Sequence, residues 1–498
     1  MSENRNSYGN ILKSMGLFGG VQVFQILVGL IKNKFVAILL GPAGMGVVGM
    51  IANATSVIET LTGFGLRTSA TRGIASATSE KDEYKLGRVL SVVRRLVILT
   101  GLLGAATVFL LAKQLSIWSF GNEDYTLAFR LVSVTAFLNQ LCIGQTTLMQ
   151  GTFHYKLMAK ASLTGSVIGL FISIPLYYKW GEIAIVPVII ISSLTSLLLS
   201  TYYSRKVAYQ RVKLTNREVW QEGKPLLGLG LAIALTGVVG LGQNYLIKAF
   251  ISNVGNIADV GLYAAGTTLT SMYVNTILNA MASDYSPRLA SMSHNREAFI
   301  ETINRQMKLL VTIIMPMIVI FIVIIKELTI LLYSDKFLPI TTMIEWMMAG
   351  MFFRAISWSI SFAQVARGDS KVFFWNEFAN TLYSLIFYVV GYRYFHFDGL
   401  GLAFVLNYIC YTIQMYFLSR RRFKYCVSKD TMQVLLQNFV VLVVAMLAMR
   451  LLHYTVWRYI VGMILMGISC VLAYHNMNQM IPVKEAVGSF FKRLNRKV

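Results

Sequence analysis

Long apolar runs, separated by short polar connections, follow one another along almost the whole chain. A helix needs about 20 mostly apolar residues to cross a bilayer, and each run reaches that length. The pattern predicts an all-α integral membrane protein with fourteen transmembrane helices. We place these spans at 11–40, 43–66, 88–112, 125–149, 157–178, 182–204, 225–252, 258–283, 306–333, 338–365, 371–395, 398–419, 431–452 and 456–478.

Composition supports this picture and excludes most soluble classes. Apolar residues make up 56% of the chain and charged residues only 13%, against about 45–50% and about 25% in soluble domains. The longest polar connections, 67–87, 205–224 and 284–305, are too short for a separate domain. The chain carries no phosphate-binding glycine loop, and its five histidines form no metal-ligand motif. We therefore predict no cofactor, no metal and no enzymatic activity.

The distribution of basic residues predicts an orientation. With the N-terminus in the cytoplasm, most of the 45 Lys and Arg residues fall in cytoplasmic segments such as RKVAYQRVK and RRRFK, as the positive-inside rule requires. The net charge of +23 then faces anionic membrane lipids, and a nucleic-acid partner is not expected. We predict a multi-pass membrane protein with both termini cytoplasmic.

Short matches between the two halves indicate a duplication. In the first span Lys34 precedes Gly41 by seven residues, and in the seventh span Lys248 precedes Gly255 by the same interval. Gly46 opens the second span, and Gly261 opens the eighth. Six helices separate equivalent points, so both repeats have the same topology and are related by an axis along the membrane normal. Two such bundles enclose a cavity that opens to either side.

This repeat sets the predicted domain boundaries. The N-terminal lobe contains the first six spans, the C-terminal lobe the next six, and the last two spans form a hairpin outside the repeat. The boundaries are 1–204 for the first lobe, 205–224 for a cytoplasmic linker, 225–420 for the second lobe, 431–478 for the hairpin and 479–498 for a basic cytoplasmic tail.

We single out five of the basic residues inside predicted spans: Lys32, Lys34, Arg130, Lys248 and Arg354. A charge near the bilayer centre costs about 2.5–3.5 kcal/mol, so it normally faces water or a partner. The alternative is snorkelling of the side chain to the interface. We favour a cationic cavity for the three lysines and Arg354, and snorkelling for Arg130.

Polar residues accompany the lysines on both helices. Gln25 shares a helix face with Lys32, and Gln243 and Asn244 come shortly before Lys248. Two helices from two lobes thus each carry a polar, basic stripe at a similar depth. An anionic substrate would account for the cations, and we include these amides among the candidate substrate-binding residues.

Three acids inside predicted spans are candidates for burial: Glu59, Glu345 and Glu377. Two roles are open for them. They could pair with the cations inside the spans, or one of them could carry a coupling ion if burial keeps its carboxyl protonated.

Four charged residues lie at the predicted inner ends of the second and eighth spans: Arg67, Arg72, Asp284 and Arg288. These residues either form an inner gate that closes the cavity or serve as anchors at the membrane interface.

An ordered set of segments resembles a known family. The stretches LLGPAGMGVVGM, SFGNEDY, GLYAAGTTLT, SPRLASMS and YSDKF are similar to those of the Wzx-type O-antigen and lipid III flippases, which belong to the multidrug/oligosaccharidyl-lipid/polysaccharide (MOP) exporter superfamily. The resemblance covers roughly residues 10–420. The fourteen spans are a departure, since many of these flippases have twelve.

The resemblance implies a fold and a function. It implies two six-helix lobes in a V around a cationic cavity, where Lys32, Lys34 and Lys248 would be the basic positions. It implies a substrate of undecaprenyl pyrophosphate bearing an oligosaccharide, moved between leaflets by alternating access. Glycan polymerase and chain-length proteins are candidate partners.

Two other classes stay open at this stage. A multidrug or small-cation exporter of the same superfamily would favour acids in its cavity, whereas this chain has at least as many bases there. A membrane-bound glycan polymerase or ligase usually needs a large external loop with catalytic groups, and the predicted external loops are short.

Overall fold

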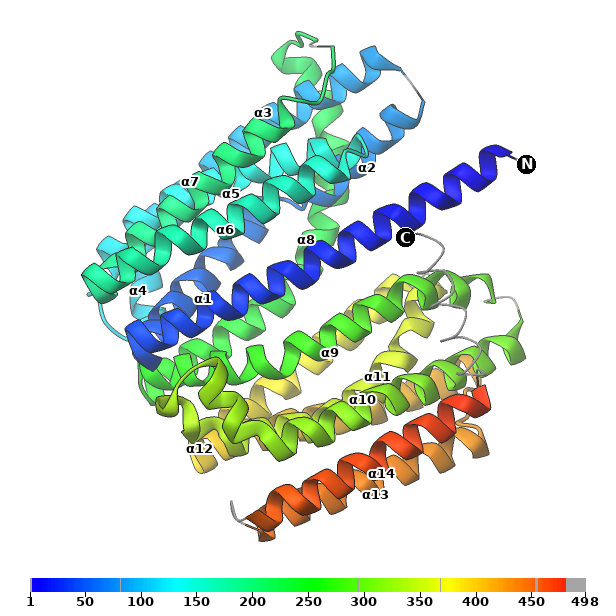
Figure 1. Cartoon of the computed structure of the whole chain (residues 1–498). Helices are drawn as coiled ribbons and strands as arrows, with labels where there is room; N and C mark the ends of the chain where they lie inside the picture. The colour runs from blue at the N-terminus through cyan, green and yellow to red at the C-terminus, as the bar shows by residue number, and fades with distance from the viewer. Residues whose placement is uncertain are drawn as a thin grey trace, which may run out of the picture. The chain divides into compact units, whose positions relative to one another are not determined.

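The chain folds into long helices, as a computed structural model shows (Figure 1). The structure describes residues 2–80, 82–210, 212–292, 295–367, 369–452 and 456–480, and none of these residues forms a β-strand. The predicted all-α class is therefore confirmed. Most of the predicted basic tail, from residue 481 on, lies outside the described residues.

Within the described residues, eight helical stretches are long and apolar enough to cross a membrane, which confirms a multi-pass membrane protein. Each contains 18 consecutive residues with at most two charged side chains, as the cost of burying charge in hydrocarbon demands. The finer count of fourteen crossings stays a prediction. The eight stretches are Val23–Thr62, Glu83–Leu110, Thr126–Gly151, Tyr155–Ser204, Arg296–Leu332, Lys371–Phe423, Lys429–Leu451 and Val456–Gln479.

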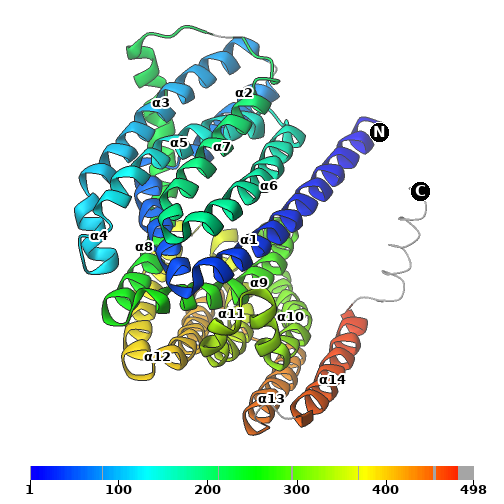
Figure 2. The same cartoon turned by 60° about the vertical axis from the view of Figure 1, so that its left-hand side comes forward.

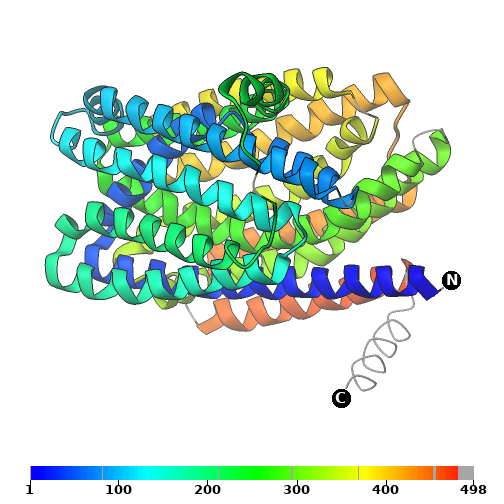
Figure 3. The ribbon, with the colours of Figure 1, turned by 90° about the horizontal axis from the view of Figure 1, so that it is seen from above.

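Two compact units make up the chain, and the first contains residues 1–264 and 332–336. Several of its helices run side by side, as two views of the ribbon show (Figures 1 and 3). Its elements are α1 (Ser2–Thr62), α2 (Leu66–Ser79), α3 (Glu83–Leu110), α4 (Ala112–Phe120), α5 (Thr126–Gly151), α6 (Tyr155–Trp180), the 3₁₀ turn η1 (Gly181–Ala184), α7 (Ile185–Ser204), α8 (Asn216–Val254) and the start of α9 (Ile257–Ser291).

The second unit contains residues 265–331 and 337–498. Within it, α13 and α14 form a hairpin and lie next to each other (Figure 2). Besides the rest of α9, its elements are α10 (Arg296–Leu332), the 3₁₀ turn η2 (Asp335–Ile340), α11 (Thr341–Ala366), α12 (Ser370–Phe423), α13 (Lys429–Leu451) and α14 (Val456–Met480). The division between units at residue 264 does not coincide with the predicted linker 205–224, so the predicted lobe boundaries stay a proposal.

Two of the longest helices are interrupted where the sequence predicts a connection between spans. In α1 the break is at Gly41, whose φ of 68° and ψ of −170° are easily reached only by glycine. Pro42 follows, and a proline fits the first turn of the next helical segment because that turn needs no backbone donor. In α12 the break is at His396, with φ 47° and ψ −127°. The predicted ends of the adjoining spans, at 40 and 395, fall beside these residues.

The predicted linker between α7 and α8 is ordered against α3. Ser91 Oγ donates to the Val212 carbonyl over 2.7 Å, and Arg95 donates to the Leu214 carbonyl over 2.6 Å. At the start of α8, Thr215 and Glu218 form a reciprocal capping box. The backbone N–H and the hydroxyl of Thr215 both donate to the Glu218 carboxylate and lower its pKa.

The glycines predicted to be equivalent in the two repeats pack against each other in the first unit. A Cβ atom on Gly46 would lie 2.0 Å from the Ile257 carbonyl oxygen, and a Cβ on Gly261 would lie 1.9 Å from the Pro42 carbonyl oxygen. Each glycine thus meets the carbonyl four residues before the other glycine. The contact is reciprocal, and it needs two residues without side chains.

We predict that Gly46→Ala lowers the stability of the purified protein by about 1–3 kcal/mol, because the added methyl group forces two backbones apart. Gly169→Ala is the matched control, since nothing lies within 4 Å of a Cβ placed there. Thermal unfolding in detergent measures both. An unchanged melting temperature for Gly46→Ala would show that the backbones separate without cost.

Candidate functional site

Two of the predicted cavity lysines lie on the first segment of α1, before the break at Gly41. Lys32 and Lys34 are both half-buried within the first unit. On the same helix the Gln25 amide donates to the Ser162 hydroxyl on α6. The predicted polar stripe on α1 therefore contacts a neighbouring helix at Gln25.

Lys248 on α8 is more buried than either of them, with 7% of its surface exposed. Among the described residues none forms a hydrogen bond or an ion pair with its ammonium group. Gln243, five residues earlier, is half-buried, and Asn244 is exposed. Helices α1 and α8 contact each other within the first unit. A buried ammonium without a counter-ion is costly, so this position is the strongest signal of an anion site in that unit.

Arg354 lies in the second unit, on α11, with neutral partners. Its guanidinium donates to Asn275 Oδ1 on α9 over 2.6 Å and lies 5.7 Å from the centre of the Tyr408 ring on α12. No acid in the described part of the chain forms an ion pair with it. The Arg354 guanidinium is therefore held by an amide and an aromatic ring, and neither of these groups neutralises its positive charge.

The three acids have partners other than those expected from the sequence. Glu59 on α1 accepts a hydrogen bond from Asn139 Nδ2 on α5 over 3.0 Å. Glu377 on α12 accepts one from the Tyr411 hydroxyl. Among the described residues, Glu345 on α11 is the one of the three that forms an ion pair, and its partner is not among the five basic residues that we singled out inside spans.

That partner is Arg458, near the start of α14. Its Nη2 lies 3.0 Å from Glu345 Oε1, and the exposed fractions of the two side chains are 3% and 7%. Arg458 also donates to the Ile322 carbonyl on α10 over 3.0 Å. The expected pairing of Glu345 with Arg354 or a lysine is therefore wrong. Sequence reasoning missed Arg458 because it lies at the third residue of its helix, where a cation usually reaches the interface.

The four gate candidates are split between the units. Arg67 and Arg72 are exposed on α2 in the first unit. In the second unit Arg288 forms an ion pair with Asp284 on the same helix, at 3.5 Å, and donates to Gln306 Oε1 over 3.2 Å. A gate role for these residues stays a prediction.

Arg130 is exposed on α5, with its guanidinium 5.8 Å from the centre of the Phe109 ring. This placement agrees with the interfacial role that we favoured for it. Within the described residues, no group of three or more His, Cys, Asp or Glu side chains is arranged to hold a metal ion.

Solved structures similar to this one define the class of fold. An inward-facing multidrug resistance MATE transporter of the MOP superfamily superposes with a TM-score of 0.67 at 15% identity, over 80% of this chain and 94% of that one. The lipid II flippase MurJ, in an inward closed conformation, superposes with a TM-score of 0.64 at 16% identity, over 93% and 99% of the two chains. The protein therefore has the fold of the MOP transporters.

Sequence comparison then gives the family. The sequence profile of the polysaccharide biosynthesis proteins matches residues 35–342, more than half of the chain, and the chain belongs to that family. The lipid III flippase of Escherichia coli (strain K12) is 21% identical over 375 residues, 73% of this chain and 87% of that protein. The lipid III flippase of Shigella flexneri matches equally well.

These comparisons confirm the family resemblance seen in the sequence. The similar proteins are flippases and transporters rather than catalysts, which agrees with the prediction that the chain is not an enzyme.

We predict that breaking the Glu345–Arg458 pair destabilises the second unit. Either Glu345→Leu or Arg458→Met alone should cost about 3–5 kcal/mol, because the remaining charge is buried without a partner. The double variant should recover most of that loss, since it buries no charge at all. Thermal unfolding of the purified protein measures all three. A double variant that loses the sum of the two single effects would show that the two charges do not depend on each other.

Proposed function

We propose that this protein is a flippase that moves an undecaprenyl-pyrophosphate-linked oligosaccharide, an O-antigen or related repeat unit, from the cytoplasmic to the outer leaflet. Membership of the polysaccharide biosynthesis family and similarity to the lipid III flippases support the class of substrate. The single observation that carries the proposal is Lys248, a buried cation that no described residue neutralises.

The chemistry of the substrate explains why such cations are useful. A pyrophosphate and its sugars lose water without compensation when they enter hydrocarbon, which is the main barrier to crossing. Lysines in a hydrated cavity replace that water with charge-assisted hydrogen bonds. Lys32 and Lys34 on α1 and Lys248 on α8 would share the pyrophosphate, and the amides of Gln25, Gln243 and Asn244 would contact polar groups beside it. Arg354, in the second unit, is a separate candidate for contact with an anionic group of the substrate.

We infer fourteen membrane crossings arranged as two six-helix lobes in a V, with the last hairpin added. Three of the eight apolar stretches, of 40, 50 and 53 residues, are long enough to cross twice at 1.5 Å per residue. With α8, α9 and α11 the helices then account for fourteen crossings. The reciprocal packing of Gly46 and Gly261 supports a two-fold relation between the repeats, because each glycine meets the equivalent part of the other helix.

The predicted lobes 1–204 and 225–420, joined by the linker 205–224, belong to the same proposal. So does the inner-membrane location with both termini cytoplasmic, which the distribution of Lys and Arg supports. Reporter fusions at either end of the chain test this orientation. Glycan polymerase and chain-length proteins would act on the product in the outer leaflet.

A multidrug exporter is the second candidate, favoured by the TM-score of 0.67 with a MATE transporter. At 15% identity that likeness concerns the fold. A cavity for organic cations needs acids that face the substrate. Here the three candidate acids inside predicted spans form hydrogen bonds with Asn139, Arg458 and Tyr411. The lysine substitutions described below separate the two functions, since an exporter of cations gains nothing from three lysines.

Glu59 and Glu377 are our candidates for ion coupling, because each carboxyl has a neutral hydrogen-bond partner inside a membrane helix. We predict that Glu59→Gln or Glu377→Gln lowers, by about tenfold, the stimulation of transport by a proton or sodium gradient, a change equivalent to ~1.4 kcal/mol. Transport of a lipid-linked oligosaccharide into proteoliposomes, with and without the gradient, measures it. Glu123→Gln, in an exposed loop, is the control. Unchanged stimulation in both variants would remove the acids from the coupling step.

The proposed pyrophosphate site predicts a graded response to substitution of Lys32, Lys34 and Lys248. Lys→Arg should preserve transport, because the charge is kept. Lys→Ala should reduce it by about 10- to 100-fold, since one charge-assisted hydrogen bond contributes ~1.5–3 kcal/mol, and some transport should remain because the other lysines are kept. Lys→Glu should abolish it, because the substituted carboxylate repels the ligand. The measurement is surface glycan display in a strain that lacks its own flippase.

Protein abundance in the membrane is checked for every variant in this series. Lys160→Glu, an exposed position on α6, controls for the change in net charge. If all three Glu variants reach the membrane and still support glycan display, the lysines do not bind the pyrophosphate, and Arg354 becomes the next position to test.

A further inference from the structure

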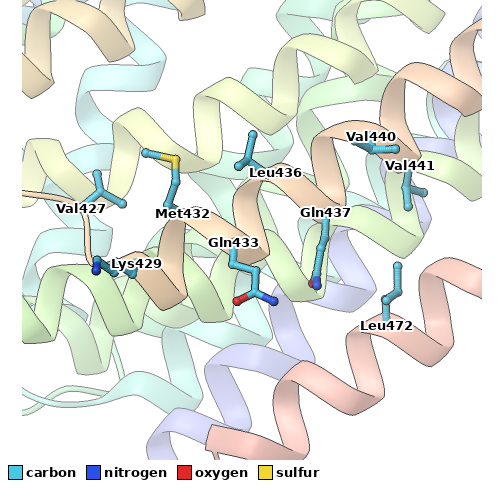
Figure 4. A pocket seen from close by; sticks show the side chains of 9 residues that line it. All are labelled: Val427, Lys429, Met432, Gln433, Leu436, Gln437, Val440, Val441 and Leu472. Carbon is cyan, nitrogen blue, oxygen red and sulfur yellow. The ribbon is translucent and has the colours of Figure 1, made fainter.

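The C-terminal hairpin in the second unit contains a groove between α13 and α14. The groove has a volume of 760 Å³, and its lining is mostly apolar, with Leu436 and Val440 on α13 and Leu472 on α14 (Figure 4). The groove runs along the N-terminal half of α13, which begins at Lys429. A space of this size is large enough for part of a lipid molecule.

A polar stripe runs along α13 inside this groove. Lys429, Gln433 and Gln437 follow one another at intervals of four residues, so they share one face of the helix, and all three line the groove (Figure 4). Within the described part of the chain, neither glutamine makes a hydrogen bond. Lys429 is exposed and forms no ion pair there.

The depth of these amides makes their lack of a partner informative. At 1.5 Å per residue, Gln433 lies about 6 Å and Gln437 about 12 Å along the axis from Lys429. The polar headgroup layer of a bilayer is only about 5–8 Å thick on each side. Gln437 therefore reaches the hydrocarbon, where an unsatisfied amide costs several kcal/mol. A ligand with hydrogen-bond acceptors at that depth would remove this cost.

We propose that this groove binds an anionic phospholipid. Its phosphate would accept from the Lys429 ammonium, its glycerol ester carbonyls would accept from the Gln433 and Gln437 amides, and an acyl chain would lie against Leu436, Val440 and Leu472. Lys429 lies at one end of the groove and the two amides follow it, with apolar side chains between and beyond them. The neighbouring acid Asp430 does not line the groove.

Charge around the groove favours an anionic lipid over a zwitterionic one. The segment that leads into α13 carries Arg420, Arg421, Arg422 and Lys424, and each juxtamembrane basic residue attracts anionic lipid by about 1 kcal/mol. Arg422 is the one among them with an ion pair, to Asp369 at 2.8 Å. The hairpin itself is held at both ends, because Asn304 on α10 donates to the Cys426 carbonyl and Arg458 pairs with Glu345.

The experiment measures the retention of phosphatidylglycerol and of phosphatidylethanolamine by the full-length protein in detergent, using native mass spectrometry. We expect the wild type to retain phosphatidylglycerol about tenfold more tightly, because both lipids carry the phosphate but Lys429 repels the ammonium of phosphatidylethanolamine. Lys429→Ala should remove most of this preference, because it removes the cation that repels that ammonium, and it should weaken both lipids through the lost phosphate contact. Gln433→Leu/Gln437→Leu should weaken both lipids, because both carry glycerol esters.

Arg421→Ala is the matched control, since it removes the same charge from an exposed position that does not line the groove. Its preference for phosphatidylglycerol should fall much less than that of Lys429→Ala, because Arg421 attracts the lipid only through the general surface charge. Lys429 is exposed, so its replacement leaves the packing intact, and the melting temperature of each variant checks this.

Three outcomes would overturn the assignment. If Lys429→Ala keeps the wild-type preference for phosphatidylglycerol, Lys429 does not contact the lipid headgroup. If Arg421→Ala loses as much of that preference as Lys429→Ala, the effect comes from general surface charge. Displacement of phosphatidylglycerol by an equimolar polyprenyl pyrophosphate would assign the groove to the transported class of lipid instead. None of these results depends on whether the protein transports an oligosaccharide, so the groove and the proposed function are tested separately.

Discussion

The cost of placing charge in hydrocarbon is the constraint on which the rest of this structure depends. Each charged side chain inside a membrane helix must find a partner, reach the interface or face water. Arg458 and Glu345 neutralise each other, and Arg130 is exposed beside an aromatic ring. Lys248 has neither solution among the described residues, and this exception points to a ligand.

The same constraint separates structural charges from candidate functional ones. A pair such as Glu345 with Arg458 adds several hydrogen bonds that fix α14 against α10 and α11, and buried pairs of this kind specify an arrangement more than they stabilise it. Arg354, by contrast, is held by an amide and an aromatic ring, so its charge stays available. The proposed transport function uses charges of the second kind.

Close backbone packing is the complementary feature of the first unit. Gly46 and Gly261 allow two helices to approach until their backbones touch, as small residues do at helix interfaces within membranes. The α7–α8 connection is likewise bonded to α3 through Ser91 and Arg95. The elements of this unit are thus joined both by close backbone packing and by side-chain hydrogen bonds to the backbone.

The sequence by itself determined the class of the protein. The apolar runs fixed the membrane helices because hydrocarbon admits no other local pattern, and the breaks at Gly41 and His396 fall between predicted spans. The positions of Lys32, Lys34, Lys248 and Arg354 within helices were also evident, since a charge in an apolar run is conspicuous. The ordered motifs were enough to indicate the family.

Tertiary structure alone decided which of these residues have partners. Glu345 and Arg458 are 113 residues apart, and no local pattern shows that they meet. The reciprocal glycine contact and the groove beside Gln433 and Gln437 also require distant segments to come together. Spacing along a helix predicts which residues share a face. The neighbours of that face depend on how the helices pack, and packing is a property of the whole fold.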